Sequence, residues 1–120
     1  MNGLVDEFGR ALLDLQHRST GNEDHLEITV WIDTAFNGEL VVPRAMIERL
    51  GLEQSAGIRA SLADGNEVTL ESYTCFWDWF GDLRAVEVIA NNGQMPLLGI
   101  GLLMGHRLVV DYTDLFVSLE

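Results

Sequence analysis

The sequence predicts an all-β fold, a small closed β-barrel with two short helices. Short apolar stretches recur roughly every ten residues, and turn residues separate them. Several of these stretches alternate apolar with polar side chains, which is typical of half-buried strands. The chain has 120 residues and shows neither an internal repeat nor a linker, so we expect one domain over residues 1–120.

The first predicted strands lead to a polar turn. A loose alternation over residues 10–17 indicates one strand, and a clearer strand follows it. In the clearer strand, apolar side chains occupy every second position: Leu26, Ile28, Val30 and Ile32. It runs directly into a polar turn at residues 33–38, after which the apolar stretch 40–42 is expected as a buried strand.

Two helices and several hairpins complete the predicted pattern. Pro43 suits the start of a helix over residues 44–50, and Gly51 suits its end. A second, more apolar helix is expected over residues 100–104. The remaining predicted strands form one hairpin around Asp64-Gly65 (58–62 with 67–73), a second around Gly81-Asp82 (75–79 with 83–89), and a final pair (108–111 and 115–119).

Acidic side chains dominate the charge balance. Nineteen Asp and Glu residues stand against seven basic residues, all of them Arg, and the net charge is −12. Because this charge repels phosphate backbones and anionic lipid, we expect neither a nucleic-acid partner nor a membrane partner. No apolar run approaches the roughly 20 residues of a membrane span, and the N-terminus does not resemble a secretory signal. Since the single Cys75 also suits a reducing compartment, we expect a cytoplasmic protein.

The sequence indicates neither a metal site nor a cofactor. His17, His25 and His106 lack metal-ligand spacing relative to Cys75 or to any Glu. Cys75 also has no His near it in sequence, so we expect a small core residue rather than a nucleophile. Trp77 and its aromatic neighbours alternate along a strand, which favours packing over the stacking of nucleobases.

Three motifs follow one another along the chain. The strand ending at Ile32 leads into Asp33-Thr34-Ala35, a hairpin tip falls at Asp64-Gly65, and Leu97-Leu98-Gly99 precedes a short helix. With this order and spacing, residues 10–119 resemble the retropepsin-like (retroviral-type) aspartic proteases. The resemblance is greatest to the bacterial and archaeal single-lobe branch, whose catalytic strand continues with Phe-Asn-Gly-Glu-Leu, as residues 36–40 do here.

The resemblance implies an aspartic endopeptidase that acts as a homodimer on peptide or protein substrates. Each chain would supply one Asp33, and a water molecule held between the two carboxyls would attack the peptide carbonyl. Thr34 and Ala35 would support this catalytic loop, with Thr34 bonding across the dimer. The residues implied to contact the substrate are Asn37 and Leu97, together with Leu62, Ala63, Asp64 and Gly65 of a hairpin that closes as a lid.

The resemblance also sets expectations for the chain ends and for two departures from the family pattern. Family members pair their chain ends across the two-fold axis, which would cover the apolar strand 115–119. Ala35 stands where the family has Gly, which adds strain if the loop requires positive φ there. Gly101 stands where viral relatives have Asn or Asp, so a supporting polar contact is expected to be missing.

Two other functions stay open at this point. Residues 38–52 and the hairpin after them also resemble the swapped-hairpin DNA-binding domains of bacterial transition-state regulators and antitoxins. Those domains are basic dimers, whereas residues 38–71 carry three Arg against six acidic residues, which makes a poor phosphate partner. The second alternative is a retropepsin-like fold without catalysis that serves as a peptide-binding or dimerisation module.

Overall fold

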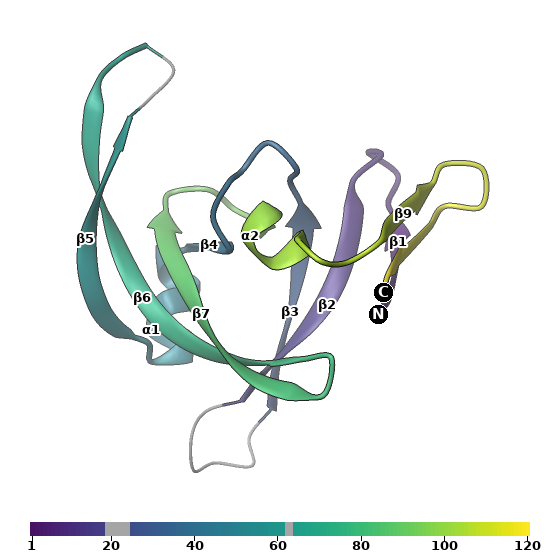
Figure 1. Cartoon of the computed structure of the whole chain (residues 1–120), viewed down its shortest axis with the longest axis horizontal. Helices are drawn as coiled ribbons and strands as arrows, with labels where there is room; N and C mark the ends of the chain where they lie inside the picture. Colours follow the sequence, from purple (N-terminus) through teal and green to yellow (C-terminus); the bar gives the residue numbers. More distant parts are fainter. Residues whose placement is uncertain (19–24, 62–63) are drawn as a thin grey trace.

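The computed structural model describes residues 1–18, 25–61 and 64–120, which form a curved β-sheet with two short helices (Figure 1). Its elements, in chain order, are β1 (Asn2–Val5), β2 (Ala11–Arg18), β3 (His25–Ile32), β4 (Leu40–Pro43), α1 (Arg44–Leu50), β5 (Glu53–Ser61), β6 (Glu67–Trp79), β7 (Asp82–Asn91), β8 (Leu97–Leu98), α2 (Ile100–Leu103), β9 (Leu108–Asp111) and β10 (Phe116–Leu119). Neither helix of the described segments is long and apolar enough to cross a membrane.

The sheet is open, so the predicted closed barrel is not confirmed. Its strand order within the described residues is β5-β6-β7-β4-β8-β3-β2-β1-β10-β9, which leaves β5 and β9 at the edges. β2 also meets β6, but at the single register pair His17 opposite Trp77. One pair does not make a continuous ladder, and the sheet continues past β2 into the strands of the chain ends. The sheet therefore curls back on itself without closing.

Two predicted elements differ from the structure in an informative way. The strands expected at residues 67–73 and 75–79 form one strand, β6, because Thr74 pairs with Glu87 and the ladder with β7 continues through it. β6 thus serves both hairpins, with β5 at one end and β7 at the other. The sequence pattern did not indicate β1, a short strand whose partner β10 lies at the other end of the chain.

The core lies inside the curl of the sheet. Alternate residues of the strands point inward, and the helix residues Ile47 and Leu102 add to them. The most deeply buried side chains include Leu13, Val30, Leu40, Val42, Trp77, Val88, Leu98, Leu102, Val117 and Leu119. Burial of these side chains from strands far apart in sequence supplies most of the driving force for folding.

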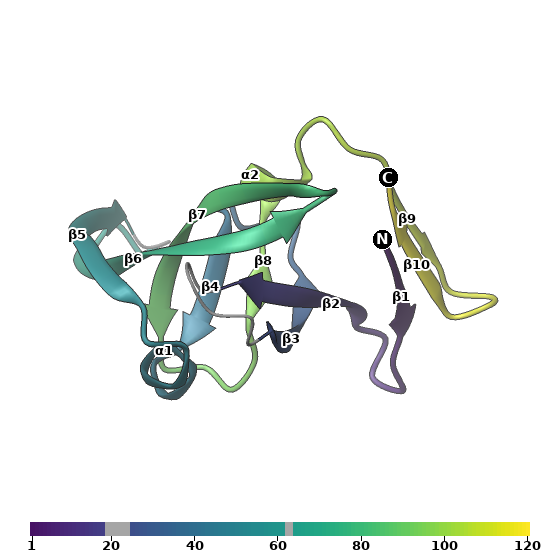
Figure 2. The same ribbon diagram turned by 90° about the horizontal axis from the view of Figure 1, so that it is seen from below.

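The two chain ends pair with each other. β10 lies between β1 and β9 of the same chain, and Figure 2 shows the N- and C-termini side by side. Val117 and Leu119 of β10 are fully buried. Both edges of the apolar strand that was expected to need a partner chain are thus paired within its own chain, while Phe116 stays 41% exposed on the outer face. The physical reason is β1, which the sequence pattern did not reveal and which occupies one edge of β10.

His106 connects the terminal sheet, by which we mean the paired strands β1, β10 and β9, to the turn between β6 and β7. The indole N–H of Trp79 donates to His106 Nε2 at 3.3 Å, and the His106 ring stacks on Phe80 with 4.4 Å between centroids. His106 Nδ1 lies 3.1 Å from the Glu120 carbonyl oxygen. Because an indole N–H can only donate, Nε2 accepts and Nδ1 carries the proton that bonds Glu120.

The centre of the sheet is the two-residue strand β8, which lies between β3 and β4. β8 runs parallel to β3, with Trp31 opposite Leu97, and antiparallel to β4, with Leu40 opposite Leu98. β3 and β4 follow each other in sequence, so a strand from much later in the chain separates two sequence neighbours. The loop between β3 and β4, residues 33–39, must therefore arch over the end of β8.

Gly99 makes this arch possible. Its N–H donates to the Glu39 carbonyl at 2.9 Å, which brings two backbone segments into direct contact. A Cβ atom on Gly99 would collide with the Gly38 carbonyl oxygen and would lie 2.7 Å from the Phe36 carbonyl oxygen. The backbone of Gly99 is extended, with φ −103°, so space rather than conformational freedom requires glycine here.

We expect Gly99→Ala to destabilise the fold by about 3 kcal/mol, because the new methyl group meets rigid backbone atoms. Urea unfolding followed by tryptophan fluorescence measures the change. Gly93→Ala is the matched control, since a Cβ there lies 3.1 Å from Asn91 Nδ2, the end of a side chain, and meets no rigid backbone atom. The control should change stability by less than about 1 kcal/mol. Equal effects of the two variants would contradict the proposed close approach.

Candidate active site

Asp33 lies where β3 ends, at the start of the 33–39 loop. Its N–H donates to the Leu98 carbonyl at 2.9 Å, which continues the β3–β8 ladder by one residue. Its carboxylate oxygen Oδ1 accepts the Ala35 N–H at 3.0 Å, and its carbonyl accepts the Phe36 N–H at 3.2 Å. These bonds fix both the backbone and the side chain of Asp33, while the residue stays partly exposed to solvent.

The residues beside Asp33 are accessible. Thr34, Ala35 and Asn37 are all exposed. Phe80 and Leu115 are the non-glycine residues with positive φ among those described, and Ala35 is not one of them. Backbone strain at Ala35 is therefore absent, and its methyl group costs the loop nothing in backbone conformation.

Three backbone hydrogen bonds hold the rest of the loop. The carbonyl groups of Phe36, Gly38 and Glu39 accept the N–H groups of Ile100, Gly101 and Gly99 at 2.8, 2.9 and 2.9 Å. The segment Leu97-Leu98-Gly99 and the start of α2 thus form the floor under the loop. Of the residues predicted for the site, the structure brings together Asp33, Thr34, Ala35, Asn37 and Leu97 in this region.

Glu39 supplies a polar contact beside Gly101, where the sequence suggested that one is missing. A Cβ on Gly101 would lie 2.9 Å from Glu39 Cγ and 3.0 Å from the Gly38 carbonyl carbon, so a larger residue does not fit. Glu39 turns its carboxylate to β7, where it accepts from Arg84 Nη2 at 2.6 Å and from the Glu87 N–H at 2.9 Å. The side-chain support for the loop therefore comes from β7, in addition to the backbone hydrogen bonds from the start of α2.

Trp31 was not among the residues predicted for the site, and it lies on the outer face of β3 two residues before Asp33. It is 40% exposed, which is unusual for Trp. Cross-strand neighbours on the same face continue from it, and together they form an apolar row: Phe116, Leu4, Leu12, Trp31 and Leu97. The alternation in β3 places Trp31 with Glu27 and Thr29, so a Trp among polar outer positions was the available signal.

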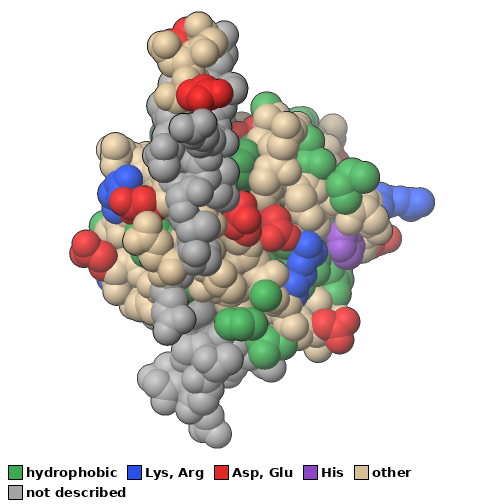
Figure 3. Space-filling view, turned by 60° about the vertical axis from the view of Figure 1, so that its left-hand side comes forward, with side chains coloured by type: hydrophobic (Ala, Val, Ile, Leu, Met, Phe, Trp, Pro, Cys, Tyr) green, Lys and Arg blue, Asp and Glu red, His purple; other side chains and the backbone are tan. Residues whose placement is uncertain are grey.

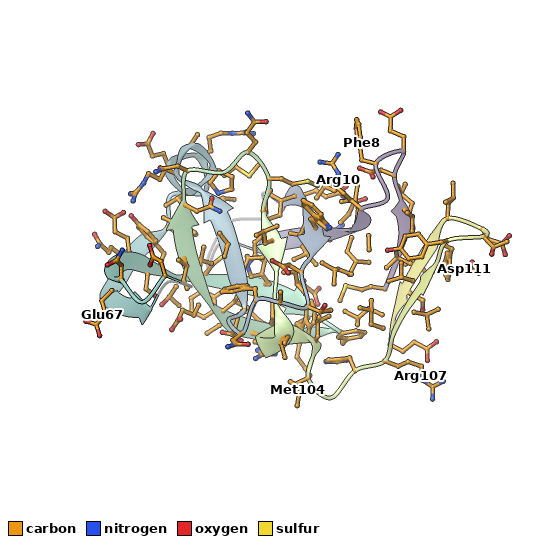
Figure 4. All side chains as sticks on the ribbon, turned by 90° about the horizontal axis from the view of Figure 1, so that it is seen from above. Phe8, Arg10, Glu67, Met104, Arg107 and Asp111 are labelled. Carbon is orange, nitrogen blue, oxygen red and sulfur yellow. The ribbon has the colours of Figure 1, made fainter. Side chains whose placement is uncertain are left out.

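Arg10 adds a cation to this row. Its guanidinium carbon lies 5.7 Å from the Trp31 ring centroid and 5.1 Å from that of Phe8, and Figure 4 shows Phe8 and Arg10 together at one end of the molecule. Asp6 holds the guanidinium in place through a 2.7 Å bond from Arg10 Nε. The face that carries Asp33 therefore offers both apolar and cationic contacts.

The β5–β6 hairpin carries the other predicted residues. It projects from the body on the side where the 33–39 loop arches (Figure 1). Its tip contains Asp64 and Gly65, where Gly65 has φ +88° and Asp64 Oδ1 accepts the Asn66 N–H at 3.0 Å. Leu62 and Ala63 lie outside the described residues.

Asp and Glu side chains predominate over Arg on the face in Figure 3, in line with the net charge of −12.

A hydrogen-bonded network fastens the base of this hairpin. Glu71 Oε2 accepts from the Tyr73 hydroxyl at 2.8 Å and from Arg44 Nη1 at 2.6 Å, and Arg44 Nε donates to Asn92 Oδ1 at 3.3 Å. The bonds from Tyr73 and Arg44 hold the pKa of Glu71 below its usual value. The bond to Glu71 in turn raises the pKa of the Tyr73 hydroxyl. The network links β6, α1 and the end of β7.

The described residues contain no group of three or more His, Cys, Asp or Glu side chains suited to a metal ion. The Cys75 thiol is buried, and desolvation raises its pKa to about 12. A thiol with so high a pKa is almost entirely protonated at neutral pH and is a poor nucleophile.

We expect Glu71→Gln to lower the pKa of Tyr73 toward its ordinary value, because a negative acceptor is removed. Phenolate absorbance in a Tyr112→Phe background measures this change, and Glu7→Gln is the control.

The network also makes the stability of the fold depend on pH. The contribution of Glu71 to stability is present above the usual carboxyl pKa and disappears as the pH falls through the lowered pKa of Glu71. The Tyr73 contribution disappears as the pH rises through the raised value. An unchanged Tyr73 titration would contradict the network.

Comparison with solved structures identifies the fold. A retropepsin-like aspartic protease from Rickettsia conorii superposes with a TM-score of 0.70 at 14% identity, covering 99% of this chain and 89% of that one. The retroviral protease-like domain of Ddi1 from Leishmania major superposes with a TM-score of 0.50 at 13% identity, covering 91% and 88%. No family sequence model matches the chain, and no curated protein is a detectable sequence relative. The chain has the retropepsin-like fold.

Proposed function

We propose that this chain is an aspartic endopeptidase that acts as a homodimer through paired Asp33 residues. The observation that carries the proposal is the placement of Asp33 in this fold, at the end of β3 and bonded to the Leu98 carbonyl. The side chain is partly exposed and its orientation is fixed by the Ala35 N–H. We further propose that residues 1–120 act as one domain in the cytoplasm.

The chemistry requires two carboxyl groups a few ångströms apart. At that distance the two carboxyl groups cannot both be ionised, because their negative charges repel each other. One Asp33 therefore keeps a proton, and the other accepts a proton from water. The water attacks the peptide carbonyl, while the protonated carboxyl donates to its oxygen and later assists the departing amine. Thr34 would hold the two loops together, and Asn37, Leu97 and the tip of the β5–β6 hairpin would contact the peptide.

A second copy of the chain is needed because one chain supplies one such carboxyl. The apolar row supports this assembly, since it leads from the terminal strands to the strand that bears Asp33. Leu4 and Phe116 are 54% and 41% exposed, although they are large apolar side chains. Exposed apolar residues that adjoin one another favour a protein interface.

The structure bears on one of the two alternative functions but not on the other. The swapped-hairpin DNA-binding function is disfavoured, because β4 pairs with β7 and β8 of its own chain within a retropepsin-like fold. The inert module differs from the protease in activity alone, so it is decided by assay.

We expect Asp33→Asn to reduce cleavage of a mixed peptide library by at least about 100-fold, because the amide cannot accept the proton of water. The two proteins are compared from acid to neutral pH by mass spectrometry. Wild-type activity should follow a bell-shaped pH profile, since one carboxyl must be ionised and the other protonated.

Asp14→Asn is the matched control, because Asp14 is an exposed strand residue that bonds Thr29 and lies outside the loop. Cleavage that is equal in wild type and Asp33→Asn would exclude the aspartic-protease mechanism. Complete inactivity of a dimeric wild-type protein would favour the inert module.

We expect Leu4→Ser and Phe116→Ser each to weaken dimerisation by at least about tenfold, because they remove apolar contact area. Sedimentation velocity over a concentration series measures the association. Leu83→Ser is the matched control, since Leu83 is also 54% exposed but lies at the β6–β7 turn. A monomeric wild-type protein at micromolar concentration would refute the homodimer.

A further inference from the structure

A pocket of about 300 Å³ lies at the end of β3 opposite Asp33. Three segments enclose it: the first half of β3, α1 and the residues before β8, which Figure 2 shows together at the lower side of the ribbon. Its lining residues are Glu27, Ile28, Thr29, Met46, Arg49, Leu50, Gln94, Met95 and Pro96. None of these belongs to the site around Asp33. The volume lies at the lower end of the usual range for ligand pockets.

One wall of the pocket is a strand edge that pairs with no strand of the described segments. The N–H groups of Trp31 and Asp33 donate to the carbonyl groups of Pro96 and Leu98. The backbone N–H and C=O groups of the odd-numbered residues of β3 therefore point toward the β8 side. The ladder stops at Pro96, because proline has no N–H to offer to the next carbonyl along β3. On this edge, the backbone groups of Glu27 and Thr29 have no partner strand among the described residues.

The side chains around this edge favour one kind of ligand. Met46, Leu50 and Met95 are half-buried and form an apolar wall with two adaptable thioethers. Arg49 stands at the rim, exposed, and makes no hydrogen bond or ion pair with any described residue. The guanidinium groups of Arg10, Arg44 and Arg84, in contrast, are each paired with a carboxylate. In a chain of net charge −12, Arg49 is thus a cation available for an outside carboxylate.

We propose that this pocket binds an extended peptide segment as an added strand beside residues 27–29 of β3. The backbone of the segment would bond Glu27 and Thr29, an apolar side chain would lie against Met46, Leu50 and Met95, and one acidic side chain would pair with Arg49. Glu27 and the overall negative charge disfavour segments with several acidic residues. Binding at this pocket does not depend on cleavage at Asp33.

The test uses the full chain carrying Asp33→Asn, so that no peptide is cut. The probe is acetyl-Thr-Leu-Glu-Leu-Thr-amide, titrated to about 1 mM while amide shifts are followed by NMR. We expect saturable shifts at Glu27, Thr29, Gln94 and Met95. Arg49→Glu should weaken binding about tenfold, because it replaces an attraction with a repulsion, and Gln in place of the probe's Glu should weaken it about threefold, because the ion pair is exposed. N-methylation of alternate probe residues, made in both registers, should abolish binding in one register, because it removes the N–H donors of one strand edge.

Arg107→Glu is the matched control and should change the affinity less than twofold, because Arg107 is exposed near the terminal sheet (Figure 4). Absence of saturable shifts, equal binding by Arg49→Glu, or equal shifts from acetate alone would overturn the proposal. Shifts confined to residues 33–39 and 64–66 would overturn it too, while leaving the proposed protease function intact. Cleavage by the wild type tests that function separately.

Discussion

The whole arrangement depends on the insertion of β8 between β3 and β4. A strand of two residues separates two segments that are neighbours in sequence, so the loop between them must cross over it. The crossing is tight enough that Gly99 donates directly to the Glu39 carbonyl, and no side chain fits between. This close approach fixes residues 33–39 from below. The position of Asp33 depends on β8 as well, because the Asp33 N–H donates to the Leu98 carbonyl and so extends the β3–β8 ladder.

Features set by neighbouring residues could be predicted from the sequence. The alternation before Ile32 indicated the strand and the turn that bears Asp33, and Pro43 with Gly51 indicated the bounds of α1. Gly51 and Gly65 have φ of +64° and +88°, which explains why glycine marked the helix end and the hairpin tip. In each case the cause lies within a few residues, where backbone conformation and period are informative.

Features set by distant partners could not be predicted. The sheet continues past β2 because β1 pairs with β2 and with β10 from the other end of the chain, and no local pattern encodes the pairing with β10. The sequence did not show that Trp31 belongs to an apolar row, because its neighbours in that row, Leu12 and Leu97, lie on other strands. Gly101 has no side chain to support the loop, and the ion pair of Glu39 with Arg84, 45 positions apart in sequence, supports it instead. Sequence spacing alone does not report which side of a loop provides its support.

The shortness of β8 accounts for both the candidate active site and the pocket. At one end, Gly99 turns the chain under the loop of Asp33. At the other, Pro96 ends the ladder, and the edge of β3 beyond it pairs with none of the strands that the structure describes. The two places are opposite ends of one short ladder, joined by the bonds of Trp31 and Asp33. A peptide strand beside Thr29 would prolong that ladder and stiffen β3 up to the loop. If the pocket binds such a strand, its occupancy would therefore act on the loop of Asp33 through β3 alone.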